Sequence, residues 1–219
     1  MDGKIEILGH GNGFVIVKKP VGADSEDKGG QSVPALVRNT LSIGYAEPCH
    51  RLDKAVCGCL LVATDKNAAA SLSEAVRSRE IEKEYLCVCE GSFNADERRG
   101  EMKDLLFFDR SKQKSFVSKK ARRGVKEASL EYEVLDSAVC GDGRTLSLVK
   151  IKLHTGRTHQ IRVQFASRHH SLCGDGKYGS HDNKCTVALL SYALTVKGER
   201  TECKPDTDTY PWNMFEYYK

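Results

Sequence analysis

The chain has 219 residues, of which 29% are charged and 40% are hydrophobic, and its formal net charge is +4 at pH 7. This composition excludes a chain that is disordered in bulk, and the length allows one large domain or two small lobes. The mild positive charge permits an anionic partner without requiring one. No apolar run approaches the roughly 20 residues that cross a bilayer, and the first residues lack a signal-peptide pattern, so we expect no membrane partner.

The first 91 residues predict alternating strands and helices. Short apolar runs bounded by proline, glycine or polar residues predict three strands, at 14–20, 59–64 and 84–91. Apolar spacing predicts two helices, at 33–41 and 66–80, and Asp65 is the expected N-cap of the second. The polar, glycine-rich residues 22–32 predict a loop.

A basic segment occupies the middle of the chain. Residues 110–124, RSKQKSFVSKKARRG, contain seven Lys or Arg residues and no acidic residue. Such a run is typical of a solvated loop, but it also suits a segment that contacts phosphates. The sequence leaves both interpretations open.

The second half of the chain predicts further strands and one helix. Alternating residues predict strands at 129–135 and 145–153, and the GDG turn at 141–143 predicts that they form a hairpin. A helix is expected after Gly156, and a buried strand at 188–196. Together the elements predict an α+β fold, with a mixed, mostly antiparallel sheet and helices packed against one face.

The nine cysteines predict reduced thiols and no metal site. Cys57 and Cys59 are two residues apart, as are Cys87 and Cys89, so each pair shares one strand face and is expected to be buried. No C-x-x-C pair occurs, which removes the usual zinc spacing. Reduced thiols are typical of the cytoplasm, which is the expected location.

Polar groups gather beside apolar runs at two places. The segment HRLDKAV at 50–56 puts Asp53 directly before a buried strand, where an ionised carboxylate needs a partner. The segment TGRTHQIR at 155–162 carries two arginines, and one of them directed at Asp53 would keep that carboxylate ionised. More than 100 residues separate the two segments, so spacing alone does not establish a contact.

Three motifs that follow one another along the chain are the strongest indication of its family. HRLDKAVCGCLLVA, EKEYLCVCEG and LHTGRTHQIRVQFASRHHSLCGDGKYG resemble the successive motifs of the RluA-type pseudouridine synthases. The resemblance covers residues 14–196. It implies a pseudouridine synthase fold with a central catalytic cleft, isomerisation of a uridine in ribosomal or transfer RNA to pseudouridine, and no cofactor or metal. We expect one catalytic domain over 1–219, no preceding RNA-binding domain of the S4 type, and a monomer.

The resemblance also assigns roles to single residues. Asp53 matches the catalytic aspartate, which acts as a nucleophile or as a proton acceptor on an extruded nucleotide. Tyr85 matches the tyrosine that stacks on the base, where its hydroxyl would assist proton removal from C5. Arg162 matches the arginine that pairs with the catalytic aspartate. Asp175 and Tyr178 suggest a structural turn near the site.

RNA contacts are expected from two groups of residues. His50 and Arg51 would help to extrude the base, or would only stabilise the turn, and Arg157 would contact phosphate or support its loop. The basic segment adds Lys119, Lys120, Arg122 and Arg123. Val56 and Cys57 replace the Thr-Ser that is usual in the first motif, which bears on the choice of substrate. The alternative function is an RNA-binding module that kept the fold and lost catalysis.

Overall fold

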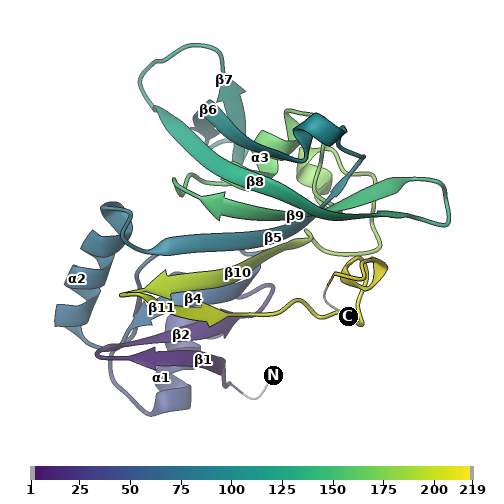
Figure 1. Cartoon of the computed structure of the whole chain (residues 1–219). Coiled ribbons are helices and arrows are strands. Elements are labelled where there is room, and N and C mark those ends of the chain that lie inside the picture. Colours follow the sequence, from purple (N-terminus) through teal and green to yellow (C-terminus); the bar gives the residue numbers. More distant parts are fainter. Residues whose placement is uncertain (1–2, 218–219) are drawn as a thin grey trace. The chain divides into compact units, whose positions relative to one another are not determined.

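The computed structural model describes residues 3–217 and divides into two compact units (Figure 1). The first unit comprises residues 3–83 and 190–204, and the second comprises 84–189 and 205–217. Within 3–217 no helix is both long and apolar enough to cross a membrane. Each unit is built around its own strands, so each is described separately.

The first unit contains four main strands. They run in the order β1 (Glu6–Gly11), β2 (Phe14–Lys19), β4 (Cys57–Ala63) and β10 (Leu189–Val196). β2 pairs antiparallel with β1 and β4, whereas β10 pairs parallel with β4. Two short strands extend these pairings: β3 (Glu47–Pro48) joins β4, and β11 (Glu199–Glu202) joins β10. The apolar residues of β2 and β4 are buried, which makes these strands the core of this unit.

Two helices belong to the first unit. α1 (Val33–Leu41) has the predicted bounds, and α2 (Lys66–Arg77) begins as predicted because the Asp65 carboxylate accepts a hydrogen bond from Ala68 N at 2.9 Å. α2 ends three residues earlier than predicted. The cause is Arg79, whose φ of 66° is incompatible with a continuing helix.

The second unit is an antiparallel sheet. Its strands run in the order β5 (Glu82–Glu90), β9 (Thr145–Leu153), β8 (Val125–Val139), β6 (Arg99–Asp109) and β7 (Lys114–Ser118). The predicted hairpin is confirmed, since β8 and β9 pair antiparallel across the turn at 141–143. The unit also has the helix α3 (Gln160–Ala166) and three short 3-10 helices, η1 (Ala95–Glu97), η2 (Gly176–Tyr178) and η3 (Trp212–Met214). The predicted α+β fold with a mostly antiparallel sheet is confirmed.

The basic segment is not a loop throughout, and this corrects the sequence prediction. Residues 114–118 form β7, which pairs with β6 from Leu105 to Asp109. Ser115 is buried, and both of its polar groups find partners: its Oγ donates to Thr158 O at 2.5 Å and its N–H donates to Tyr178 Oη at 2.7 Å. Partners more than 40 residues away in the chain therefore hold this strand in place.

The helix predicted after Gly156 begins only at Gln160. The Gln160 side chain folds back, and its Oε1 accepts bonds from Thr155 Oγ1 at 2.7 Å and from Arg157 N at 3.1 Å. His159 precedes the helix with a φ of 54°. These contacts keep residues 155–159 in a turn and shorten the helix.

Candidate active site

The segment around Asp53 is held by its backbone in the first unit. Ser25 Oγ donates to Leu52 O at 2.8 Å and accepts from Leu52 N at 3.0 Å, which fixes the residue before Asp53. Gly22 N donates to Lys54 O at 2.8 Å, which fixes the residue after it. Asp53 O accepts from Val56 N at 2.9 Å and closes a turn. The half-buried Asp53 side chain is therefore presented from a rigid turn.

A buried lysine lies beneath this turn. The Lys19 side chain is fully buried, and its Nζ donates to the carbonyls of Pro20 at 3.0 Å, Lys54 at 3.3 Å and Val56 at 2.8 Å. Burial lowers the pKa of Lys19 to about 8, while the negative charge of Asp53 acts in the opposite direction. Lys19 is thus still an ammonium at neutral pH. The sequence analysis missed this residue, although a lysine that ends an apolar strand was a usable signal.

His50 has a structural position. Its Nε2 accepts a hydrogen bond from Leu61 N at 3.2 Å, which ties the turn to β4. Burial lowers the pKa of His50 to about 3, and the positive charge of Lys83 lowers it further, so the ring is neutral at pH 7. This geometry favours the turn-stabilising alternative for His50. Arg51 is different, because it lies at the surface and pairs with Glu26 at 2.9 Å.

Gly58 allows the strand after the turn to approach β10. Its φ is 110°, and a Cβ built there would lie 2.3 Å from Ser191 O. Any side chain at this position would therefore push β4 and β10 apart. The glycine of the HRLDKAVCG motif thus has a packing role just downstream of Asp53.

Arg162 has a buried partner in the second unit. Its Nε and Nη2 donate to the two carboxylate oxygens of Asp175 at 2.6 Å and 2.8 Å. The two side chains are 7% and 1% exposed, so this is a buried, bidentate ion pair. The sequence analysis placed Asp175 in a structural turn and missed this contact, for which the GDGKYG motif was the only signal. The pairing of Arg162 with Asp53 stays a prediction.

The turn before α3 is supported by neighbouring groups. Tyr178 Oη lies 2.9 Å from His159 Nδ1, and the Arg162 guanidinium lies 5.1 Å from the Tyr178 ring centre. Arg157 Nε donates to Glu127 O at 2.8 Å. Support of the loop is therefore the role of Arg157 that the structure favours, and contact with phosphate stays a prediction.

Tyr85 lies on β5, in register with Ile151 of β9. Only 5% of the residue is exposed, so most of the ring is packed within the protein. Its stacking on a base and the use of its hydroxyl stay predictions.

Four residues of the basic segment lie at the surface of the second unit. Lys119, Lys120, Arg122 and Arg123 are all exposed, and the Arg122 guanidinium lies 5.0 Å from the Phe107 ring centre. Beside them is a hollow of about 770 Å³. Its walls include Phe107, Phe108, Arg110, Lys126 and Arg157. Aromatic and cationic groups in one hollow are the combination that single-stranded nucleic acid favours.

The geometry can be set beside known proteins. Residues 13–167 match the family described as RNA pseudouridylate synthase. An uncharacterized RNA pseudouridine synthase of Aquifex aeolicus is 32% identical over 200 residues, which are 85% of this chain and 60% of that protein. Ribosomal large subunit pseudouridine synthase D of Yersinia pestis is 29% identical over 203 residues, covering 89% of this chain and 58% of that protein. The chain thus spans about 60% of these relatives.

Solved structures show the same fold. Human RNA pseudouridylate synthase domain containing 1 superposes with a TM-score of 0.78 at 23% identity, covering 96% of this chain and 86% of that one. The match over 155 of 219 residues (13 to 167) and the identity to the Aquifex protein confirm the resemblance seen in the motifs. The chain belongs to the RNA pseudouridylate synthase family.

Proposed function

We propose that this chain isomerises uridine in RNA to pseudouridine, with Asp53 as the catalytic residue. The observation that carries the proposal is the rigid turn around Asp53, which offers one carboxylate in a fixed position. Hydrogen bonds from Ser25 and Gly22 and the buried Lys19 ammonium hold the backbone on both sides of it. Such preorganisation is what a reacting carboxylate requires.

The reaction needs little more than positioned groups from the protein. The N1 glycosidic bond breaks, the detached base turns, C5 bonds to the ribose, and the C5 proton leaves. Before this, the nucleotide must leave its stack so that a side chain can reach it. Asp53 acts either as a nucleophile or as a base at C2′, and both roles need the ionised carboxylate. Tyr85 would face the base, and Arg162 would pair with Asp53.

The substrate is an RNA of the ribosomal or transfer class. We place ribosomal RNA first, because the Yersinia relative carries that substrate in its name. The exposed residues Lys119, Lys120, Arg122 and Arg123 would hold the phosphate backbone, and Arg51 would add one contact. We further propose that the chain acts as a monomeric, single catalytic domain in the cytoplasm, where its cysteines would stay reduced.

Release of tritium from RNA that contains [5-³H]uridine tests the reaction. We expect release by the wild-type chain, none by Asp53→Asn, and wild-type release by the control Asp27→Asn. Asp27 suits the control because it lies at the surface of the neighbouring loop and pairs with Arg38. RNA binding without release by the wild-type chain would instead support a binding module that lost catalysis. Sequencing of pseudouridine sites in ribosomal and transfer RNA then identifies the target class.

A further inference from the structure

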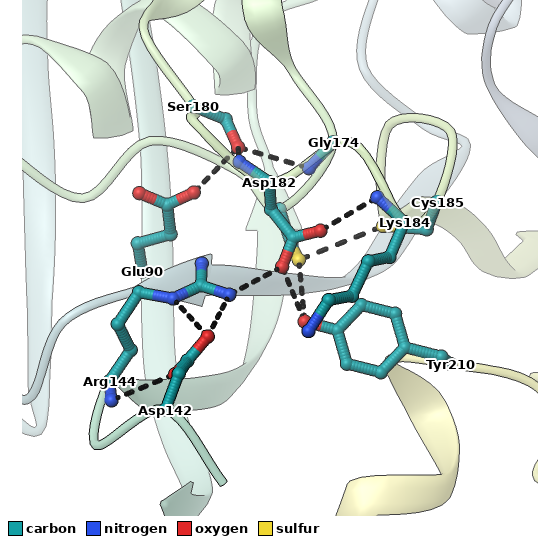
Figure 2. Close-up of polar contacts among 10 residues, drawn as sticks. Glu90, Asp142, Arg144, Gly174, Ser180, Asp182, Lys184, Cys185 and Tyr210 are labelled. Atoms are coloured by element: carbon teal, nitrogen blue, oxygen red, sulfur yellow. Dashed lines mark hydrogen bonds and ion pairs between the residues drawn. The ribbon is translucent and has the colours of Figure 1, made fainter. Parts of the chain in front are cut away.

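Three potential metal ligands meet in the second unit. They come from one loop, and the sulfur or carboxylate atoms of Cys173, Asp182 and Cys185 all lie within 4.8 Å of one another. Cys173 and Asp182 are buried and Cys185 is half-buried. Figure 2 shows Asp182 at the centre of this group, beside Arg144 and Tyr210. None of the three residues belongs to the machinery proposed above for uridine isomerisation.

The backbone brings the two thiols together. Gly174 has a φ of 78°, and a Cβ built there would lie 2.4 Å from Thr186 O and 2.5 Å from Cys185 O. The chain can pass this closely only because glycine follows Cys173. Ala188 N also donates to Cys173 O at 2.8 Å, which holds the backbone at Cys173 close to the segment that follows Cys185. The thiol pair is therefore a consequence of the fold and does not depend on flexible side chains alone.

The spacing of the sulfur atoms suits zinc. Cys173 Sγ and Cys185 Sγ are 3.7 Å apart. Two thiolates bound at about 2.3 Å to one tetrahedral zinc ion are separated by about 3.8 Å. Two sulfurs and one carboxylate oxygen form a soft, mixed donor set that zinc accepts, whereas calcium and magnesium prefer oxygen alone.

The neighbouring groups orient the carboxylate and balance its charge. Asp182 Oδ1 accepts from Lys184 N at 2.9 Å, and Oδ2 accepts from Tyr210 Oη at 2.5 Å and from Arg144 Nη2 at 3.2 Å. Hydrogen bonds of this kind hold metal-binding carboxylates in place. Two thiolates and one carboxylate carry one more negative charge than zinc neutralises. The Arg144 guanidinium, which also pairs with Asp142 at 2.8 Å, offsets part of that excess.

We propose that Cys173, Asp182 and Cys185 bind one zinc ion, with a water molecule as the fourth ligand. Binding converts the two thiols to thiolates and releases two protons, so affinity rises with pH. The ion would stiffen the loop that carries Asp175, the partner of Arg162. The proposal replaces the sequence prediction of no metal site, which rested on the absence of C-x-x-C. Here the cysteines are twelve residues apart (185 − 173), a spacing that the fold closes.

The test measures metal binding by the full chain, independently of its activity. Protein reduced and stripped of metal is titrated with zinc against a chromophoric chelator, and with cobalt to detect thiolate-to-cobalt charge transfer. We expect one zinc per chain and a cobalt–thiolate absorption band. Cys185→Ser and Asp182→Asn should each weaken zinc by more than about 100-fold, beyond the roughly 10–100-fold that loss of an outer hydrogen bond costs.

Cys140→Ser is the matched control. Cys140 belongs to the same buried cluster as Cys173 but not to the ligand group, so this variant should bind zinc as the wild type does. Circular dichroism checks that Cys185→Ser is folded, which is expected because Cys185 is half-buried. The proposal is overturned if the reduced wild type binds no zinc, or if Cys140→Ser weakens zinc as much as Cys185→Ser does. Formation of a Cys173–Cys185 disulfide in air, with no zinc bound when the protein is kept reduced, would equally overturn it.

Discussion

The two units hold their buried charges in different ways. In the first unit, the Lys19 ammonium donates hydrogen bonds to three backbone carbonyls. In the second unit, buried charges meet in pairs, as Arg162 does with Asp175. A carbonyl cage depends on the backbone, whereas an ion pair depends on both side chains. Single substitutions should therefore separate chemistry from stability in the first unit and disturb both in the second.

The largest effect is expected at Asp53. Asp53→Asn should abolish turnover, because an amide is neither a nucleophile nor a base here, and should leave RNA binding within about tenfold. The variant should remain folded at the assay temperature, since the turn is held by the backbone of Leu52, Lys54 and Val56. Kinetics, binding and calorimetry on one preparation check all three points. Multiple turnover by the variant would remove Asp53 from the reaction.

Arg162→Met should damage both activity and stability. It leaves the Asp175 carboxylate buried without its arginine, and breaking a buried pair costs about 3–5 kcal/mol. Denaturant unfolding measures the loss. Arg99→Met is the control, because the Arg99–Glu133 pair lies at the surface and should contribute less than about 1 kcal/mol. Equal destabilisation by both variants would mean that burial of the Arg162–Asp175 pair adds nothing to its contribution to stability.

The third prediction concerns the stability of the protein in acid, which we expect to depend on His50 in the first unit. The unfolded chain protonates His50 below its ordinary pKa of 6.5, whereas the folded chain holds the pKa at about 3. The unfolded state therefore binds the extra proton, and stability is lost as pH falls from 6.5 towards 3. The loss is about 1.4 kcal/mol per pH unit, or about 2 kcal/mol at pH 5.

Unfolding as a function of pH checks this expectation. His50→Gln should flatten the decline between pH 6.5 and 5, because glutamine carries no proton-binding ring. His10→Gln, at an exposed position of the same unit, is the control and should keep the wild-type slope. An unchanged slope in His50→Gln would mean that other groups determine acid unfolding.

The smallest effect on turnover is expected at the basic segment. Replacing four of its exposed basic residues by glutamine should reduce the slope of log affinity against log salt by about two to three units, because fewer phosphates are neutralised. Turnover at saturating RNA should barely change. The variant carries Lys119→Gln, Lys120→Gln, Arg122→Gln and Arg123→Gln.

A matched variant in the first unit tests whether RNA affinity depends on the position of the basic residues or only on the total charge. Four exposed basic residues there are replaced by glutamine, and the salt dependence should stay near that of the wild type. The positions are Lys4, Lys66, Arg77 and Lys197. An equal change in both variants would mean that total charge, not the basic segment, determines affinity.

Local patterns predicted much of this molecule. The bounds of α1 and the cap at Asp65 follow from residues within a few positions, and both are confirmed. β7 was missed because the basic residues of 110–124 suggest a solvated loop, although the strand pairs with the neighbouring β6. One of its further contacts is distant in sequence, since Lys114 Nζ donates to Lys177 O, 63 residues away. Alternation in a short basic stretch does not reveal such a partner.

The candidate site shows the same limit. The motif around Asp53 was legible, and the family assignment that it suggested is confirmed. The contacts that hold the site in place could not be predicted from the sequence. Lys19 donates to carbonyls up to 37 residues away, and Arg162 meets Asp175 only because the chain turns between them. The types of residues in a motif indicate the reaction, but only the folded structure shows which other groups hold the reacting residues in place.

β10 is synthesised long after β4, the strand that it pairs with, and this has a consequence for folding on the ribosome. Ser191 Oγ donates to Cys59 O at 2.9 Å, across 132 residues of chain. At roughly 5–20 residues per second, β4 waits on the order of ten seconds for this neighbour. During that interval one edge of β4, next to the Asp53 turn, is open to pairing with other nascent chains. A chaperone that binds apolar strands early in translation should therefore raise the yield of folded protein more than one added after release.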